Sequence, residues 1–217
     1  MRKRLTALQS SEIIREILSQ AKVIPVLTVT DSADAVPLAR SLTDGGLNVL
    51  EVTLRTKNAL HVIEEMSKLK QAVVGVGTLL NRRDVENAVK VGAKFGVSPG
   101  LTDDLIVACE ENGLPLLGGV ASVSEAMKVY DRGYDSMKFF PAESLGGVLT
   151  LKAIEAPLPQ VAFCPTGGIS LENAENYLAQ KNVACIGGSW MATPDMIRNK
   201  KWSEIAHEAT IAATLGK

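Results

Sequence analysis

Apolar and polar positions follow one another along this chain in a repeating cycle. A helical stretch ends near a glycine and a short run rich in Val, Ile, Leu or Phe follows, as in DGGLNVLEVTL, VGAKFGVSPG, ENGLPLLGG and RGYDSMKFFP. The glycines of these segments suit the left-handed residue that closes a helix; they are Gly45, Gly92, Gly113 and Gly133. Helix starts are marked too, because Ser122 and Glu125 predict a capping box and Ser170 precedes a helical stretch.

The cycle contains eight apolar runs of strand length, at residues 23–29, 49–54, 72–77, 94–98, 114–118, 136–140, 161–165 and 183–188. Strands that alternate with helices without a long linker predict a single α/β domain over residues 1–217, a closed parallel (β/α)8 TIM barrel. Residues 1–20 predict an additional N-terminal helix that covers the barrel floor, with apolar side chains at helical spacing; these are Ile13, Ile14, Ile17 and Leu18.

An open doubly wound sheet is the alternative fold. The segment from Gly75 to Leu80 begins like the turn that binds dinucleotides in such sheets, but it lacks the third glycine of that fingerprint. The barrel therefore remains the prediction.

Composition narrows the class of protein. Hydrophobic residues make up 46% of the chain and charged residues 22%, as in an ordinary soluble globular protein. The formal net charge is -1 and the basic residues are spread along the chain, so neither nucleic acid nor an anionic membrane is an expected partner. The first residues lack the apolar core of a secretory signal, and no apolar run reaches the ~18 residues of a membrane span. We expect a cytoplasmic protein.

Cysteine and histidine are scarce. Cys109, Cys164 and Cys185 form no CxxC pair, and we expect each to be a small buried hydrophobe. With only His61 and His207, the chain offers few imidazole ligands for zinc, which disfavours a metal-dependent enzyme.

A glutamate stands in the second apolar run. Period two places Val49, Glu51, Thr53 and Arg55 on one face of this strand and only apolar side chains on the other. The apolar face of a barrel strand packs against helices, so Glu51 is expected to point inward. Because a buried carboxylate is costly unless it is paired, Glu51 either has a function or forms an ion pair with an inward basic residue.

A lysine stands in the sixth run, SMKFFP. Alternation puts Lys138 and Phe140 on the face opposite Met137 and Phe139. If the lysine faces the interior, desolvation disfavours its ammonium form and favours the neutral amine that attacks a ketone. If it faces outward, it extends past the helices to solvent, and the strand alone does not decide. The presence of Glu51 favours the inward orientation of Lys138. The ends of barrel strands form the active face, and a carboxylate there can move protons for imine chemistry.

Two glycine pairs suggest an anion site. Thr166, Gly167 and Gly168 follow the seventh run, and Gly187, Gly188 and Ser189 follow the eighth. Backbone N–H groups in such loops bind phosphate, and the loops after strands seven and eight are its recurrent position in this barrel. The alternative is that these glycines only close tight turns.

Six segments in this order resemble the 2-keto-3-deoxy-6-phosphogluconate (KDPG) aldolases, also described as 4-hydroxy-2-oxoglutarate aldolases: VLEVTLRT, GVGTLLN, SPGLT, KFFPAE, FCPTGGIS and CIGGSW. The resemblance implies a class I aldolase, a lyase of carbohydrate metabolism in the Entner-Doudoroff pathway. It would cleave KDPG to pyruvate and glyceraldehyde 3-phosphate, and also 4-hydroxy-2-oxoglutarate to pyruvate and glyoxylate. Homotrimers without a metal or other cofactor are implied as well.

The resemblance also implies residue roles. Lys138 would form the Schiff base and Glu51 would transfer protons. The remaining substrate-binding residues would hold the pyruvyl carboxylate (Arg55, Thr78), shape the pocket (Pro99, Phe140) and receive the phosphate end (Thr166, Gly167, Gly168, Gly188, Ser189). One segment departs from the family pattern: Gly118, Gly119 and Val120 stand where relatives often have a proline, so the resemblance does not define the shape of the fifth loop.

Two other functions remain open. A related aldolase could act on the 6-phosphogalactonate epimer, although Thr166, a polar residue near that end of the substrate, favours the gluconate. A non-catalytic barrel could bind phosphorylated metabolites with the anion site alone, against which the presence of Glu51 and Lys138 argues.

Overall fold

The computed structural model describes residues 2–216. The predicted domain of residues 1–217 and the predicted helix of residues 1–20 also include Met1 or Lys217, which lie outside the described residues. Strands and helices alternate along the chain, as the apolar pattern predicts.

Every strand pairing within the two sheets is parallel. A curled sheet of six strands has the order β5-β4-β3-β2-β1-β9, and a second sheet of three strands has the order β6-β7-β8. The strands are β1 (Val23–Leu27), β2 (Val49–Thr53), β3 (Val73–Gly77), β4 (Gly96–Val97), β5 (Leu116–Leu117), β6 (Gly119–Val120), β7 (Ser136–Phe139), β8 (Ala162–Pro165) and β9 (Ile186–Gly188).

The two sheets meet at both edges. β5 and β6 follow each other in the chain with only Gly118 between them, and the Lys138 N–H donates to the Gly118 carbonyl at 2.9 Å. At the other edge, isolated parallel bridges join Phe163 to Val183 and Thr166 to Gly187. The fifth predicted run, which ends at residue 118, therefore stops too early, because pairing resumes in β6. A Cβ at Gly118 would lie 2.4 Å from the Leu101 side chain, so the chain passes Leu101 without room for one.

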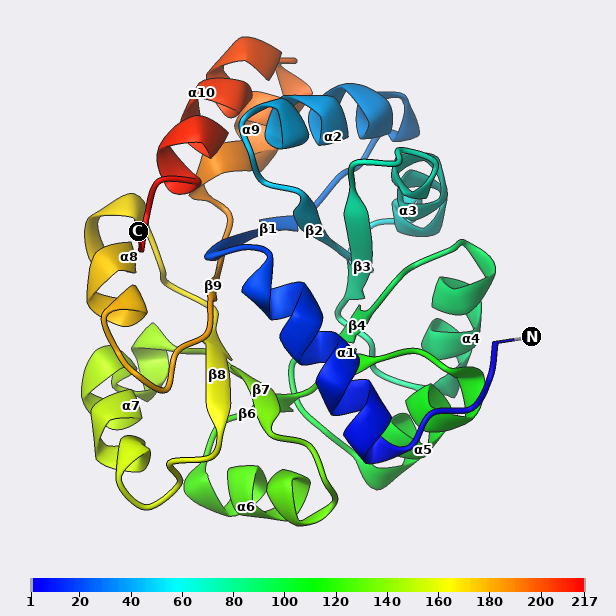
Figure 1. The fold of residues 1–217 in the computed structure, drawn as a ribbon. Coiled ribbons are helices and arrows are strands. Elements are labelled where there is room, and N and C mark those ends of the chain that lie inside the picture. Colours follow the sequence, from blue (N-terminus) through cyan, green and yellow to red (C-terminus); the bar gives the residue numbers. More distant parts are fainter. Residues whose placement is uncertain (1, 217) are drawn as a thin grey trace.

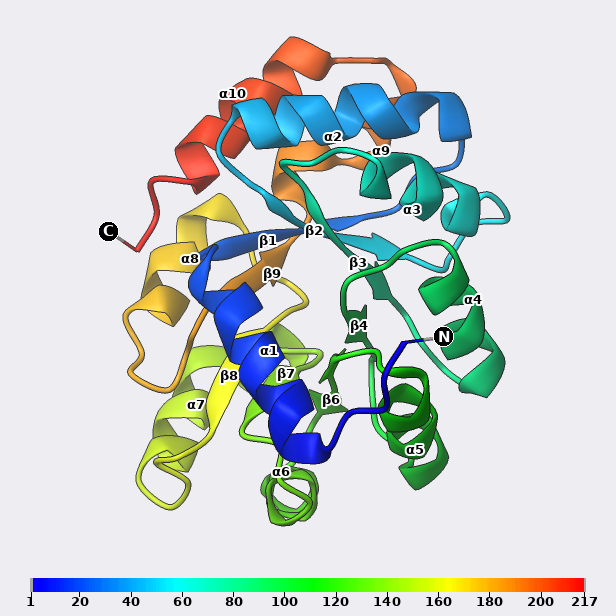
Figure 2. The same cartoon turned by 45° about the vertical axis from the view of Figure 1, so that its right-hand side comes forward.

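The helices lie around the strands, apart from α1, which crosses their amino ends (Figures 1 and 2). They are α1 (Ala7–Ser19), α2 (Ala35–Asp44), α3 (Ala59–Ser67), α4 (Arg82–Lys90), α5 (Asp103–Asn112), α6 (Val123–Asp131), α7 (Gly147–Glu155), α8 (Leu171–Leu178), α9 (Pro194–Arg198) and α10 (Trp202–Ala212). Short 3₁₀ turns form η1 (Ser32–Asp34), η2 (Glu143–Leu145) and η3 (Trp190–Ala192). Within residues 2–216, none of the helices has the length and apolar character that crossing a bilayer requires.

α1 packs on the inward side chains at the starts of the strands. Ile14, Ile17 and Leu18 are buried in a cluster with strand residues from both sheets, whereas Ile13 is only partly buried. The strand side of this cluster comprises Ile24, Val49, Phe95, Val97, Leu117, Cys164 and Cys185. A separate, larger apolar cluster lies between the strands and the outer helices. The inward side of the strands thus begins with an apolar layer under α1.

The helix-end signals are largely confirmed. Ser122 and Glu125 form the predicted capping box of α6, and Gly92, Gly113 and Gly133 have the expected positive φ. The prediction for Gly45 is wrong: its φ is -77°, and Gly46 takes the left-handed position with φ 94°. Gly45 instead allows α10 to approach, because a Cβ there would lie 2.5 Å from the Ala209 Cβ.

Candidate active site

Lys138 lies on β7 with its side chain toward the interior. The residue is 4% exposed, and its Nζ is 5.4 Å from the centre of the Phe140 ring. The alternative in which this lysine extends outward to solvent is excluded by that burial. The alternation predicted for β7 therefore holds, and Lys138 lies on the face that points away from the outer helices.

Glu51 is the partner of this lysine. It is also 4% exposed, and its Oε1 lies 3.3 Å from Lys138 Nζ. The sequence left a choice between an ion pair and a functional carboxylate, and the basic residue of the pair is Lys138 itself. A buried amine and a buried carboxylate thus face each other from β7 of one sheet and β2 of the other.

Glycine at position 77 makes room for this carboxylate. A Cβ at Gly77 would lie 2.3 Å from Glu51 Oε1 and 2.8 Å from its Cγ. β3 pairs directly with β2, with Gly77 opposite Thr53, so the Glu51 side chain lies across the neighbouring strand where a side chain is missing. Any larger residue would meet the carboxylate.

A cavity of about 120 Å³ opens among the strand ends. Its lining includes most of the predicted substrate-binding residues, namely Arg55, Phe140, Thr166, Gly167, Gly168, Gly188 and Ser189. Gly187, which belongs to the second glycine pair of the predicted anion site, also lines it, as do Val26 and Ile169, for which the sequence predicted no substrate-binding role. Val26 could have been found by period two, because Ile24 on the same strand is in the inward cluster.

Thr78 and Pro99 are not among the lining residues of this cavity. Thr78 directly follows β3, and Pro99 comes two residues after the end of β4. Thr78 has a positive φ of 65°, a conformation that is costly for a residue with a branched Cβ and that clusters at functional sites. The Pro99 backbone packs against Gly119, where a Cβ would lie 2.4 Å from the Pro99 carbonyl oxygen. Glycine at position 119, in the segment that departs from the family pattern, is thus required for the close contact with Pro99.

Backbone carbonyl groups between β8 and α8 are bound to residues that do not line the cavity. The carbonyls of Thr166 and Gly167 accept from the N–H groups of Ala142 and Glu143 at 2.9 and 3.1 Å. Gly167 and Gly168 both have positive φ, and within residues 2–216 their N–H groups donate to no protein acceptor. Free N–H donors that line a cavity are suited to an anion.

The cysteines are unpaired and buried, as expected. Cys185 and Cys164 belong to the apolar layer under α1. Hydrogen bonding to the Cys164 thiol, together with burial, raises the pKa of the Cys185 thiol well above its ordinary value. Cys185 therefore remains protonated, which disfavours a nucleophilic role for it.

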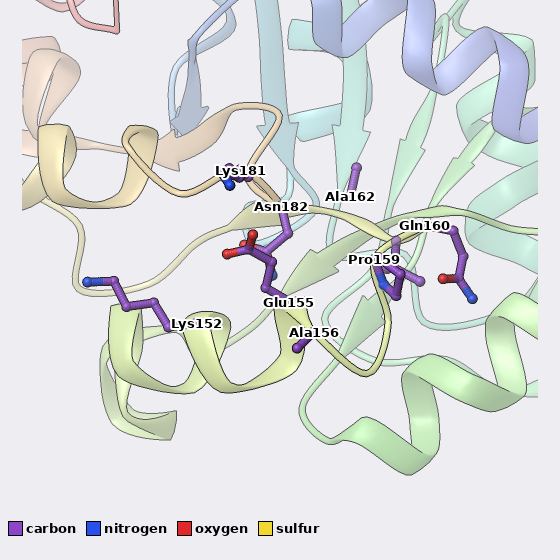
Figure 3. Close-up of a pocket in the computed structure, with 9 residues that line it drawn as sticks. Lys152, Glu155, Ala156, Pro159, Gln160, Ala162, Lys181 and Asn182 are labelled. Carbon is purple, nitrogen blue, oxygen red and sulfur yellow. The ribbon is translucent and has the colours of Figure 1, made fainter.

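A larger groove of about 600 Å³ lies at the opposite end of the strands (Figure 3). The end of α7, the start of β8 and the segment before β9 form it, with Lys152, Glu155 and Lys181 at its rim. The Asn182 amide points its Nδ2 to the Leu151 carbonyl at 2.9 Å. The groove is open and lacks a buried reactive pair, so its size does not make it the active site.

A group of possible metal ligands lies on the outer helix α3. Atoms of His61, Glu64 and Glu65 lie within 4.8 Å of one another. The side chains are already engaged with neighbours one turn away, His61 with Glu64 and Glu65 with Lys68. His61 and Glu64 are exposed on this helix, whereas Lys138 and Glu51 are buried, so the group is separate from the Lys138 site.

The arrangement suits amine chemistry on a carbonyl compound. An amine held in an apolar interior can add to a ketone, and the adjacent carboxylate can carry protons to and from the adduct. Neither Lys138 nor Glu51 is among the residues that line the cavity, but Phe140 lines it and the centre of its ring lies 5.4 Å from Lys138 Nζ. The cavity combines a guanidinium from Arg55 with free backbone N–H groups, so it can accept a molecule with an anionic group at each end.

Comparison with known proteins gives relatives along nearly the whole chain. A 2-dehydro-3-deoxy-phosphogluconate aldolase of Pseudoalteromonas atlantica is 45% identical over 203 residues, which cover 92% of this chain and 94% of that protein. A KHG/KDPG aldolase of Escherichia coli K12 is 46% identical over 203 residues, which cover 92% of this chain and 95% of that protein.

Solved structures agree. A KDPG aldolase from Legionella pneumophila, with pyruvate captured at low pH as a covalent carbinolamine intermediate, superposes with a TM-score of 0.90 at 42% identity, covering 92% of this chain and 98% of that one. The Zymomonas mobilis aldolase with 3-phosphoglycerate has a TM-score of 0.88 at 43% identity, covering 94% and 97%. The family model for KDPG and KHG aldolase matches residues 14–208, and this chain belongs to that family.

Proposed function

We propose that this chain is a Schiff-base aldolase that cleaves KDPG to pyruvate and glyceraldehyde 3-phosphate. It would also cleave 4-hydroxy-2-oxoglutarate to pyruvate and glyoxylate. The observation that carries the proposal is the buried pair of Lys138 and Glu51, with 3.3 Å between amine and carboxylate. The aldolase names of the relatives support it.

In this mechanism the neutral Lys138 amine attacks the C2 keto carbon and forms a carbinolamine, which loses water to give a protonated imine. Glu51, through a water molecule, removes the proton of the C4 hydroxyl. The C3–C4 bond breaks, its electrons move toward the imine, and glyceraldehyde 3-phosphate leaves an enamine of pyruvate. Protonation at C3 and addition of one water release pyruvate and restore the amine.

The cavity would orient the substrate between its two anionic ends. Arg55 and Thr78 would hold the pyruvyl carboxylate, and a charge-assisted contact of this kind contributes roughly 1.5 to 3 kcal/mol. Pro99 and Phe140 would shape the pocket around the keto carbon. The residues that would receive the phosphate are Thr166, Gly167, Gly168, Gly188 and Ser189.

We also infer the architecture around the site. The six-stranded and three-stranded sheets together form one closed (β/α)8 barrel, with β5 and β6 as a single interrupted strand and α1 as its floor. The contacts between the sheets at both edges support this inference. The family resemblance suggests a cytoplasmic homotrimer that needs no metal or other cofactor.

Borohydride trapping tests the proposal. Incubation with pyruvate and borohydride should attach pyruvate to Lys138, and peptide mapping by mass spectrometry locates the adduct. Lys138→Ala should abolish labelling, with Lys152→Ala, an exposed lysine on α7, as the matched control. An adduct on another lysine would overturn the assignment. Strong inhibition by a chelator would favour a metal-dependent aldolase instead.

Two comparisons separate the remaining functions. Cleavage of KDPG should exceed cleavage of its galactonate epimer, since buried Thr166 lies in the cavity. In deuterated water the protein should exchange the methyl protons of pyruvate, which a barrel that only binds phosphorylated metabolites would not do.

A further inference from the structure

A side chain also binds a carbonyl group of the anion loop, which comprises residues 166–168 between β8 and α8. The Gly168 carbonyl accepts a hydrogen bond from Asn173 Nδ2 at 3.1 Å. The Thr166 and Gly167 carbonyls accept from the N–H groups of Ala142, the residue before η2, and Glu143, the first residue of η2. Three successive carbonyls of the loop are thus bound to donors that do not line the cavity. A carbonyl turned toward the cavity would repel an anion, so this arrangement keeps only N–H groups available to it.

Asn173 is the side-chain member of this set. The other two donors are backbone N–H groups, of Ala142 and Glu143, which no substitution removes except proline. The Gly168 carbonyl thus depends on a side chain, and Gly168 has the positive φ that only glycine adopts easily. Of these three hydrogen bonds, the one to the Gly168 carbonyl can be removed by changing a side chain.

The residue type at position 173 fits this task. Asn173 is the third residue of α8, where its Oδ1 accepts from the Ser170 N–H at 2.9 Å as part of a capping box. Glu is common at that position, but a carboxylate has no donor. An amide can accept from Ser170 and donate to Gly168 at once, and this pairing also fixes which amide atom is nitrogen.

We propose that Asn173 is a positioning residue for the phosphate end of the substrate: it holds the Gly168 carbonyl away from the cavity so that the Gly167 and Gly168 N–H groups face the anion. Asn173 does not line the cavity itself, so it acts through the loop. The proposal rests on the proposed function, because it assigns a determinant of substrate class within the same site.

Asn173→Asp tests it with little risk to folding. The aspartate keeps an acceptor for Ser170, and an acidic residue in the first turn of a helix is favourable. It loses the donor and turns a negative oxygen toward the Gly168 carbonyl. We expect KM for KDPG to rise roughly tenfold while kcat changes less than about twofold, since a single loop hydrogen bond is lost. Asn173→Ala, without the added charge, should raise KM roughly threefold.

The unphosphorylated substrate separates positioning from general damage. For 4-hydroxy-2-oxoglutarate, both variants should keep kcat and KM within about twofold of the unmodified protein. The matched control is Asn176→Asp, the same charge change one turn further along α8 at an exposed position. It should leave KM for both substrates unchanged. Equal losses on both substrates, or an unchanged KM for KDPG, would overturn the proposal.

Binding measurements keep the test independent of turnover. Calorimetric titration with 3-phosphoglycerate should show weaker binding for Asn173→Asp than for Asn176→Asp by roughly tenfold. If the unmodified protein cleaves neither substrate, the proposed function fails, whereas this titration still decides the role of Asn173. Equal affinity in both variants would show that the loop does not depend on the amide.

Discussion

Glycine at position 77 determines where the Glu51 carboxylate can lie. Its φ is not in the left-handed region, so the backbone does not require glycine there. The requirement comes from space, because a Cβ would overlap the carboxylate at 2.3 Å. Gly77 therefore belongs to the geometry of the amine and carboxylate pair although it touches no substrate.

Gly77→Ala should displace Glu51 from Lys138 and lower kcat by about 10- to 100-fold, the range in which acid–base assistance is partly lost. Steady-state kinetics on 4-hydroxy-2-oxoglutarate measures this change without involving the phosphate end. Shortening the carboxylate in the double variant with Glu51→Asp should recover part of kcat relative to Gly77→Ala alone.

Gly100→Ala is the control for that substitution. A Cβ at Gly100 would meet nothing within 4 Å, so kcat should stay the same. Full activity in Gly77→Ala would show that the carboxylate can move without loss, and the steric account would be wrong.

At the residue scale, the sequence predicts what depends on strand periodicity. Alternation predicts that Glu51 points inward, because a strand places every second side chain on the same face. For Lys138 it leaves both faces possible, and only the presence of Glu51 favours the interior. Alternation does not identify Gly77, whose role arises from a side chain on the neighbouring strand. It also does not distinguish Gly45 from Gly46, because the contact that requires Gly45 comes from α10, far along the chain.

α1 is attached to the strands by buried hydroxyl groups as well as by apolar contacts. Ser11 Oγ donates to Asp135 Oδ1 at 2.6 Å and accepts from the Asp135 N–H at 3.0 Å. Ser10 Oγ accepts from the Leu116 N–H at 3.0 Å. Both serines are almost completely buried, so their loss would leave the backbone N–H groups of Asp135 and Leu116 without these acceptors.

Ser11→Ala should lower the free energy of unfolding by about 1 to 3 kcal/mol, the cost of an unsatisfied buried polar group. Urea unfolding followed by circular dichroism measures it. Activity under native conditions should persist, because α1 lies at the amino ends of the strands and the cavity lined by Arg55, Phe140 and Ser189 lies at the other end.

The control for this element is Ser19→Ala, at an exposed position of the same helix where Oγ donates to the Glu16 carbonyl. Its effect should stay within about 0.5 kcal/mol. If both variants behave alike, the contact with Asp135 does not hold α1 in place.

At the element scale, local signals predict better than long-range ones. The capping box at Ser122 needs only residues within one turn, so its sequence pattern suffices. Strand bounds depend on neighbours: of the run of residues 94–98 only Gly96–Val97 forms the strand β4. Backbone hydrogen bonds to the neighbouring strands nevertheless extend over the whole run, from Lys94, which donates to the Val74 carbonyl, to Ser98, which donates to the Leu117 carbonyl. The apolar run therefore matches the hydrogen-bonded segment better than the short strand does.

The whole molecule buries acidic groups that must stay protonated. Burial, and then the adjacent Glu110 carboxylate, raises the pKa of the Cys109 thiol to about 12. Burial likewise raises the pKa of Tyr134 and Tyr177 above the ordinary value. Because a cysteine thiol in the unfolded chain has a pKa of about 8.5, the native state keeps protons that the unfolded state loses at alkaline pH.

Stability should therefore fall as pH rises from about 9 toward 12, with Cys109 contributing up to about 1.4 kcal/mol per pH unit. Urea unfolding under reducing conditions between about pH 8 and pH 10.5 measures this slope. Cys109→Ala should make the slope shallower, whatever it does to stability at neutral pH. Parallel pH profiles for the two proteins would contradict the assignment to Cys109.

At the scale of the molecule, the sequence predicts eight strands where residues 2–216 form nine, because β6 lies outside the fifth apolar run, and it does not predict how the two sheets join. The break at Gly118 depends on Leu101, and the contacts of Thr166 with Gly187 depend on the register between β8 and β9. Such contacts involve residues distant in sequence, which periodicity does not describe. The family resemblance, rather than the apolar pattern, supplies the roles of Arg55 and Ser189.

Lys138 and Glu51 belong to different sheets, so the distance between them measures how the two halves of the molecule fit together. A small opening of the seam could separate amine from carboxylate while each sheet keeps its own hydrogen bonds. Turnover would then decline in mild denaturant before the helical signal changes. The loss of catalytic activity would then be the most sensitive indicator that the two sheets have separated.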